Sequence, residues 1–124
     1  MSDSFLLHVE DMLKDNHFPV IGFFSEISGE GRFIRIIDIL AGGVGRGLNY
    51  AGCTFPDDVE VESEKFGDGV EFYLHNGDAV VLSYEELYRY MKKAGENYVK
   101  MYQSGGDAIA AILEKMRKRY GISE

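Results

Sequence analysis

The chain has 124 residues, a length that suits one domain with a substantial hydrophobic core. The single cysteine, Cys53, excludes an intrachain disulfide, and no apolar run is long enough to cross a membrane. The formal charge of −8 disfavours binding to nucleic acid or to a membrane and favours a basic protein partner. We therefore expect one domain over 1–124 in a reducing, cytoplasmic compartment.

Three segments before residue 42 carry apolar residues at helical spacing. The first helix is predicted over 4–14, with an apolar face made of Phe5, Val9, Met12 and Leu13. The second is predicted over 18–28, where Pro19 suits the first turn and a strand is the rival interpretation. The third, over 31–41, is expected to be largely buried because its polar residues form one narrow stripe. That stripe consists of Arg32, Arg35 and Asp38.

Residues 41–52, AGGVGRGLNYAG, contain five glycines and raise the question of a phosphate-binding loop. A dinucleotide-binding fingerprint needs a third glycine at the position of Leu48, and it lies between a strand and a helix. Here the predicted order is helix and then loop, and the helix end beside Gly42 presents carbonyl groups, which repel phosphate. We therefore expect the glycines to end the helix and to let the backbone turn tightly.

The middle of the chain alternates with the period of a strand, and strands are predicted over 59–64, 69–75 and 78–83. Asn76-Gly77 between the last two indicates a hairpin with a two-residue turn. Counting outward from that turn pairs His75 with Asp78. The predicted core face consists of Val70, Phe72, Leu74, Ala79 and Val81. The opposite face consists of Glu71, Tyr73, His75, Asp78, Val80 and Leu82.

Two further helices are predicted to close the chain. Ser83 and Glu86 form a capping box before an apolar stripe that recurs as far as Tyr102. Ser104-Gly105-Gly106 ends this helix, and Asp107 is expected to cap the last one. The predicted fold class is α+β, with N-terminal helices, a central antiparallel β-meander with an Asn-Gly hairpin, and two C-terminal helices.

Groups suited to catalysis or metal binding are few. Cys53 is most simply a small buried hydrophobic residue. His75 opposite Asp78 suggests an oriented base, but an exposed cross-strand pair is the commoner arrangement. The EF-hand pattern is missing, which leaves a weak calcium site as the less favoured alternative at Asp57, Asp58 and Glu60. We expect no enzymatic activity, no cofactor and no metal.

Charge is distributed unevenly along the chain. Residues 57–86 contain ten acids and one base, whereas residues 89–119 contain eight bases and three acids. An acidic face that only keeps the protein in solution is one interpretation. The other is a binding surface for a basic protein, in which carboxylates steer the partner and aromatic rings anchor it. The candidate binding residues are Asp57, Asp58, Glu60, Glu62, Glu64, Asp68, Glu71, Tyr73, His75 and Asp78.

Two stretches resemble a known family. EGRFIRIIDILAGGVGRGLNYAGCTFPDDVE and GVEFYLHNGDAVVLSYEELYRYM are similar to the immunity proteins of bacterial contact-dependent growth inhibition (CDI), specifically those that act against ribonuclease toxins. The resemblance covers about two thirds of the chain, from Phe18 to Tyr102. It implies a small cytoplasmic protein, not an enzyme, that binds the C-terminal domain of a delivered toxin and blocks its nuclease site. Contact residues do not carry over, because immunity proteins change with their toxins.

The sign of the charge agrees with this resemblance, because a domain that cleaves RNA has a basic substrate cleft. An adaptor or regulatory domain that binds some other basic protein through the same acidic face is the alternative. A small enzyme is a more distant one.

Overall fold

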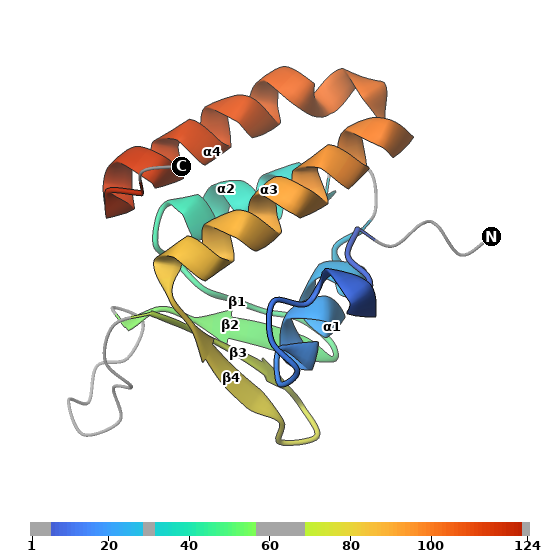
Figure 1. Ribbon diagram of the computed structural model, residues 1–124, viewed down its shortest axis with the longest axis vertical. Helices are drawn as coiled ribbons and strands as arrows, with labels where there is room; N and C mark the ends of the chain where they lie inside the picture. Colours follow the sequence, from blue (N-terminus) through green and yellow to red (C-terminus); the bar gives the residue numbers. More distant parts are fainter. Residues whose placement is uncertain (1–5, 29–31, 57–68, 123–124) are drawn as a thin grey trace.

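The computed structural model describes residues 6–28, 32–56 and 69–122. Over these described ranges the fold is α+β, as predicted, with four helices and a four-stranded antiparallel sheet of order β1-β2-β3-β4 (Figure 1). The helices are α1 (Phe18–Glu26), α2 (Arg32–Ala41), α3 (Tyr84–Met101) and α4 (Gly106–Tyr120). The strands are β1 (Arg46–Gly47), β2 (Ala51–Thr54), β3 (Val70–Leu74) and β4 (Ala79–Leu82). Two 3-10 turns complete the described elements, η1 (Val9–Asp11) and η4 (Gln103–Gly105).

The helices pack on one face of the sheet (Figure 1). Phe23 and Phe24 of α1 contact Phe72 of β3, with ring centroids 5.1 and 6.4 Å apart. On α2, the polar stripe is exposed and most of the apolar residues are buried, which confirms the prediction for this helix. α3 and α4 pack against each other, and α2 packs against α4. The core therefore lies between the sheet and the helices, and Cys53 is buried in it as predicted.

The helix predicted over 4–14 is wrong for its described part. Residues 6–16 contain only the 3-10 turn η1, and Val9 and Leu13 are exposed while Leu6 and Leu7 are buried. The Asp11 carboxylate accepts the His8 N–H at 2.9 Å, which closes a single tight turn. Phe5, the first residue of the predicted face, lies outside the described residues.

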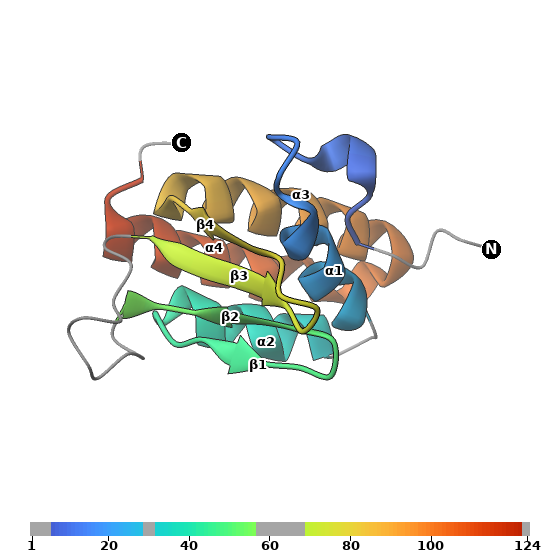
Figure 2. The ribbon, with the colours of Figure 1, turned by 90° about the horizontal axis from the view of Figure 1, so that it is seen from below.

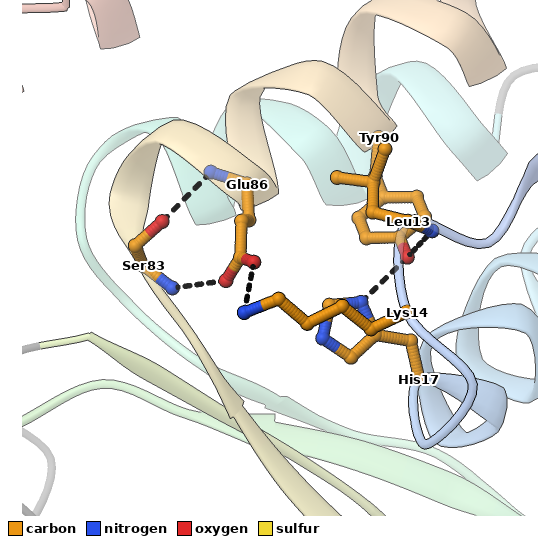
Figure 3. A network of polar contacts seen from close by, with 6 residues as sticks. All are labelled: Leu13, Lys14, His17, Ser83, Glu86 and Tyr90. Carbon is orange, nitrogen blue, oxygen red and sulfur yellow. Dashed lines mark hydrogen bonds and ion pairs between the residues drawn. The ribbon is translucent and has the colours of Figure 1, made fainter.

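Hydrogen bonds to side chains of α3, and not helical backbone bonds, hold this N-terminal segment. The Asn97 side chain of α3 donates to the Leu6 carbonyl at 2.7 Å. The Leu13 N–H donates to the Tyr90 hydroxyl at 2.8 Å, and that hydroxyl lies 2.7 Å from His17 Nδ1 (Figure 3). When the imidazole is neutral and Nδ1 is unprotonated, the hydroxyl accepts from Leu13 and donates its own proton to Nδ1.

The capping box predicted at the start of α3 is confirmed. The Ser83 hydroxyl accepts the Glu86 N–H at 3.0 Å, and the Glu86 carboxylate accepts the Ser83 N–H at 3.0 Å. Lys14 lies 3.2 Å from the same carboxylate (Figure 3). Burial alone would raise the pKa of Glu86, but the bonds from Ser83 and Lys14 outweigh it and hold the pKa below its usual value. The predicted cap at Asp107 is wrong: Gly105 is the N-cap of α4, and Asp107 lies in the first turn.

The β3–β4 hairpin forms, but its register differs by one residue from the prediction. Tyr73 pairs with Ala79 and Phe72 with Val80. The turn has three residues, because the Leu74 N–H bonds to the Asp78 carbonyl at 2.8 Å and Gly77 takes a φ of +107°. Such a shift reverses every side chain of β4. Val80 and Leu82 are therefore buried, and Ala79 and Val81, predicted to face the core, are exposed.

The glycine-rich segment is more regular than predicted. Gly43, with a φ of +83°, follows the end of α2 as expected of a helix terminator. The segment then forms β1 and β2, where only a tight turn is predicted. The strand predicted over 59–64 lies outside the described residues.

Candidate functional site

Four of the ten candidate binding residues lie within the described part of the chain: Glu71, Tyr73, His75 and Asp78. The other six lie outside it, at Asp57, Asp58, Glu60, Glu62, Glu64 and Asp68. The four described candidates lie on β3 and on the hairpin that follows it. Their placement defines one surface on the sheet and one pair of turns at its end.

The surface is the sheet face turned away from Phe72. Glu71 and Tyr73 alternate along β3 with the buried Val70 and Phe72, so they point away from the helices. The pairing places the neighbours of these two residues on the same side. We call this set the outer sheet face: Gly47, Gly52, Thr54, Glu71, Tyr73, Ala79 and Val81. In Figure 2 the sheet lies in front of α2 and α4, seen from this side.

Tyr73 lies flat on the outer sheet face because its neighbour on β2 is a glycine. A Cβ atom at Gly52 would collide with the ring and hydroxyl of Tyr73. The next strand also carries a glycine in this row, Gly47, whose position for a Cβ is 3.9 Å from the Tyr73 hydroxyl. The His75 ring meets the Tyr73 ring edge-on, with centroids 5.8 Å apart and planes at 68°. The ring of Tyr73 therefore lies over Gly52 and against the ring of His75.

Two turns meet at one end of the sheet, residues 48–50 between β1 and β2 and residues 75–78 between β3 and β4 (Figure 1). The His75 N–H donates to the Tyr50 carbonyl at 3.0 Å. His75 Nε2 lies 3.0 Å from the Leu48 carbonyl, which can only accept, so this nitrogen carries a proton. We call this region the paired turns.

The predicted pairing of His75 with Asp78 is wrong. Leu74 faces Asp78, and the Asp78 N–H bonds instead to the Asn76 side chain at 2.9 Å. His75 is oriented by the neighbouring turn and not by a carboxylate. The interpretation of His75 as a base oriented by Asp78 therefore loses its geometric support.

Tyr50 is a surface residue that is not among the ten predicted binding residues. Its side chain is 75% exposed, the largest fraction among the exposed large hydrophobic residues of the described chain. It lies in the paired turns, beside the His75 bonds. The available signal is an Asn-Tyr pair between two short glycine-containing segments, but the five glycines favour the prediction of one continuous turn.

The outer sheet face and the paired turns carry carboxylates and no lysine or arginine of their own; the nearest cation in the sequence is the exposed Arg46 of β1. Residues 69–88 contain four acids and no lysine or arginine. Within the described residues, Glu71 and Asp78 form no ion pair, whereas Glu86 is paired with Lys14. Most described ion pairs lie elsewhere, between Asp38 of α2 and Lys115 and among Glu114, Arg117 and Lys118 of α4. The outer sheet face and the paired turns therefore present uncompensated negative charge.

The described residues offer little for other chemistry. They contain no group of three or more His, Cys, Asp or Glu side chains placed to hold a metal ion. No helix among them is both long enough and apolar enough to cross a membrane. A hollow of about 320 Å³ lies between η1 and α3, but its lining mixes acids with lysines. An apolar groove of about 410 Å³ runs between α3 and α4.

A protein-family model described as "CDI immunity protein" matches residues 7–121, which include every described helix and strand. A search of curated proteins found no match.

Proposed function

The chain belongs to the CDI immunity protein family, whose members have a toxin as partner, and from this premise we propose that its partner is a basic ribonuclease domain. In this proposal the chain binds the toxin directly and covers its active site. It acts as one domain over 1–124, in the cytoplasm of the cell that makes it. It works by binding alone, without catalysis and without a cofactor.

One observation carries the proposal: the outer sheet face and the paired turns together present the carboxylates of Glu71 and Asp78 beside the ring of Tyr73, with no lysine or arginine in strands β2, β3 and β4. A ribonuclease must hold a polyanion, so its cleft is lined with basic residues. Carboxylates on a rigid sheet complement such a cleft in sign, and an ordered tyrosine supplies contact area at little entropic cost. The six candidate acids at 57–68 lie between β2 and β3 in the sequence and would add to the same charge.

The experiment uses the toxin domain encoded beside the gene for this chain, purified alone and as a complex. We expect the domain to degrade RNA, and equimolar immunity protein to abolish the activity. We also expect a double substitution of Glu71 and Tyr73 to alanine to weaken inhibition, with Glu96→Ala on α3 as the control. A complex that forms while the domain still degrades RNA would reject occlusion, and a domain without RNase activity would reject the toxin class.

A further inference from the structure

We propose that Tyr50 is an anchor of the toxin interface and that its ring receives a lysine or arginine side chain of the toxin. This inference rests on the proposed function and extends it to a residue outside the acidic middle of the chain. It enlarges the binding surface from the outer sheet face to the paired turns.

The first support is the exposure of Tyr50 on an ordered turn. An aromatic ring that is 75% exposed can bury a large area when a partner covers it. Tyrosine is enriched among the few residues that dominate interface affinity, because its ring is large and has only two side-chain torsions to fix. Tyr50 differs in this from Tyr73, whose ring already lies against Gly52.

The second support is that the backbone of Tyr50 is fixed from two sides. The Glu26 carboxylate, at the end of α1, accepts the Asn49 N–H at 2.8 Å and the Tyr50 N–H at 3.0 Å. On the other side the Tyr50 carbonyl accepts the His75 N–H at 3.0 Å. A turn of this length does not need a helix carboxylate to close, since Leu48 and Ala51 already bond at 2.8 Å. The extra bonds order the turn before binding, which lowers the entropic cost of association.

The third support is the negative charge near Tyr50, which favours a cationic side chain of the toxin over the Tyr50 ring. Glu26 and Asp78 lie at the paired turns, and the described residues 47–56 and 69–88 contain no lysine or arginine. A cation over the face of a tyrosine is attracted by the ring and here also by these carboxylates. An acidic partner would be repelled, and so would a second copy of this chain bringing the same carboxylates.

The test measures the affinity of full-length variants for the purified toxin domain encoded beside the gene. Tyr50→Ala should weaken binding roughly 30-fold or more, the loss expected of an anchor residue, mostly through faster dissociation. Tyr50→Phe keeps the ring and should stay within about threefold, since cation binding uses the ring face. Phe18→Ala removes an aromatic ring that is 50% exposed at the other end of α1 from Glu26, and it should have little effect.

The outcomes separate the two proposals. If the wild-type protein does not bind the toxin domain, the proposed function fails and the anchor fails with it. If the wild-type protein binds and inhibits but Tyr50→Ala binds equally well, only the anchor is overturned. A loss with Phe18→Ala as large as with Tyr50→Ala would also overturn it. Among the toxin lysines and arginines whose substitution weakens binding to the wild-type protein, one should have no further effect in the Tyr50→Ala background.

Discussion

The buried contact of His17 with Tyr90 links the protonation of one imidazole to the attachment of the N-terminal segment. Burial lowers the pKa of His17; Glu86 opposes this shift and Lys14 adds to it. A protonated ring would donate at Nδ1 and leave the buried Tyr90 hydroxyl proton without its acceptor. The segment that ends at Leu13 is therefore held best when His17 is neutral.

From this we predict a loss of stability in mild acid. Because the folded pKa lies below the unfolded value of about 6.5, the unfolded chain takes up a proton first as the pH falls. The free energy of unfolding should then decrease below pH 6.5 until the folded pKa is reached, by at most about 1.4 kcal/mol per pH unit. Urea unfolding at pH 7.5 and 5.5 measures this. His17→Asn keeps an acceptor and does not titrate, so an equal decrease in that variant would contradict the prediction.

Two adjacent glycines after α2 give a matched test of backbone conformation. Gly43 has a φ of +83°, where a side chain is strained, and a Cβ there would also lie 2.9 Å from Arg119 and Tyr120 atoms. Gly42 has no positive φ, and its Cβ would lie 3.4 Å from the Ile39 carbonyl. We predict that Gly43→Ala lowers the free energy of unfolding by about 1–2 kcal/mol and Gly42→Ala by clearly less, as measured in urea. Equal losses in the two variants would contradict the prediction, because the positive φ of Gly43 would then not decide the cost.

At the scale of the element, the β3–β4 hairpin shows what a local signal can and cannot specify. Asn76-Gly77 predicts a turn at the right place, but the same dipeptide serves a two-residue turn and the three-residue turn that forms. The apolar residues of β4 do not decide between them, because AVVL is apolar on both faces. The register depends on which valine packs into the core, and that is a tertiary contact.

The register can be checked with two neighbouring valines. Val80 is 9% exposed and Val81 is 42% exposed. We predict that Val80→Ala lowers the free energy of unfolding by about 1–2 kcal/mol, since it removes two buried methyl groups. Val81→Ala should stay within about 0.5 kcal/mol. Chemical denaturation measures both, and the reverse order would support the two-residue turn.

Helical spacing of apolar residues predicts the long helices but not the segment before α1. α1, α2, α3 and α4 were predictable because each repeats apolar residues at helical spacing over nine or more positions. The segment before α1 has a similar pattern, but side chains of α3 satisfy its backbone groups and leave Val9 and Leu13 exposed. Strands β1 and β2 were missed because glycine is rare in strands, and here it makes room for Tyr73.

At the scale of the whole molecule, the net charge of −8 should control how fast the toxin is captured. We predict that raising salt from low to physiological levels lowers the association rate strongly and the dissociation rate little. Charge reversal at a rim position should likewise lower mainly the association rate. Charge reversal at a desolvated central carboxylate should cost roughly 2–5 kcal/mol of binding free energy. The series covers Asp57, Asp58, Glu60, Glu62, Glu71 and Asp78, read by association kinetics and by survival against the toxin.

Glu96→Lys on α3 is the control, because it changes the net charge equally but lies on the helical side of the molecule. If all six reversals leave capture and survival unchanged in folded protein, the acidic face only keeps the protein in solution.

Part of the candidate site was predictable from the sequence. Alternation along β3 correctly places Glu71 and Tyr73 on the face away from the core, since the first strand of the hairpin was read in phase. Tyr50 was not predictable, because its position depends on Glu26 and His75, which are distant in the sequence. The acids at 57–68 remain a prediction.

Successive residues of strand β3 face opposite sides of the sheet, and this affects how the sequence of such a protein can diverge. Val70 and Phe72 pack toward the helices, whereas Glu71 and Tyr73 point to the outside of the sheet. When the toxin changes, residues 71 and 73 can be substituted while residues 70 and 72 keep the packing of the fold. The exception is Tyr73 with Gly52: a larger residue at 52 requires the ring at 73 to move or to be lost. Substitutions at these two sites are therefore coupled, and related sequences should carry a larger residue at 52 mainly where 73 is not tyrosine.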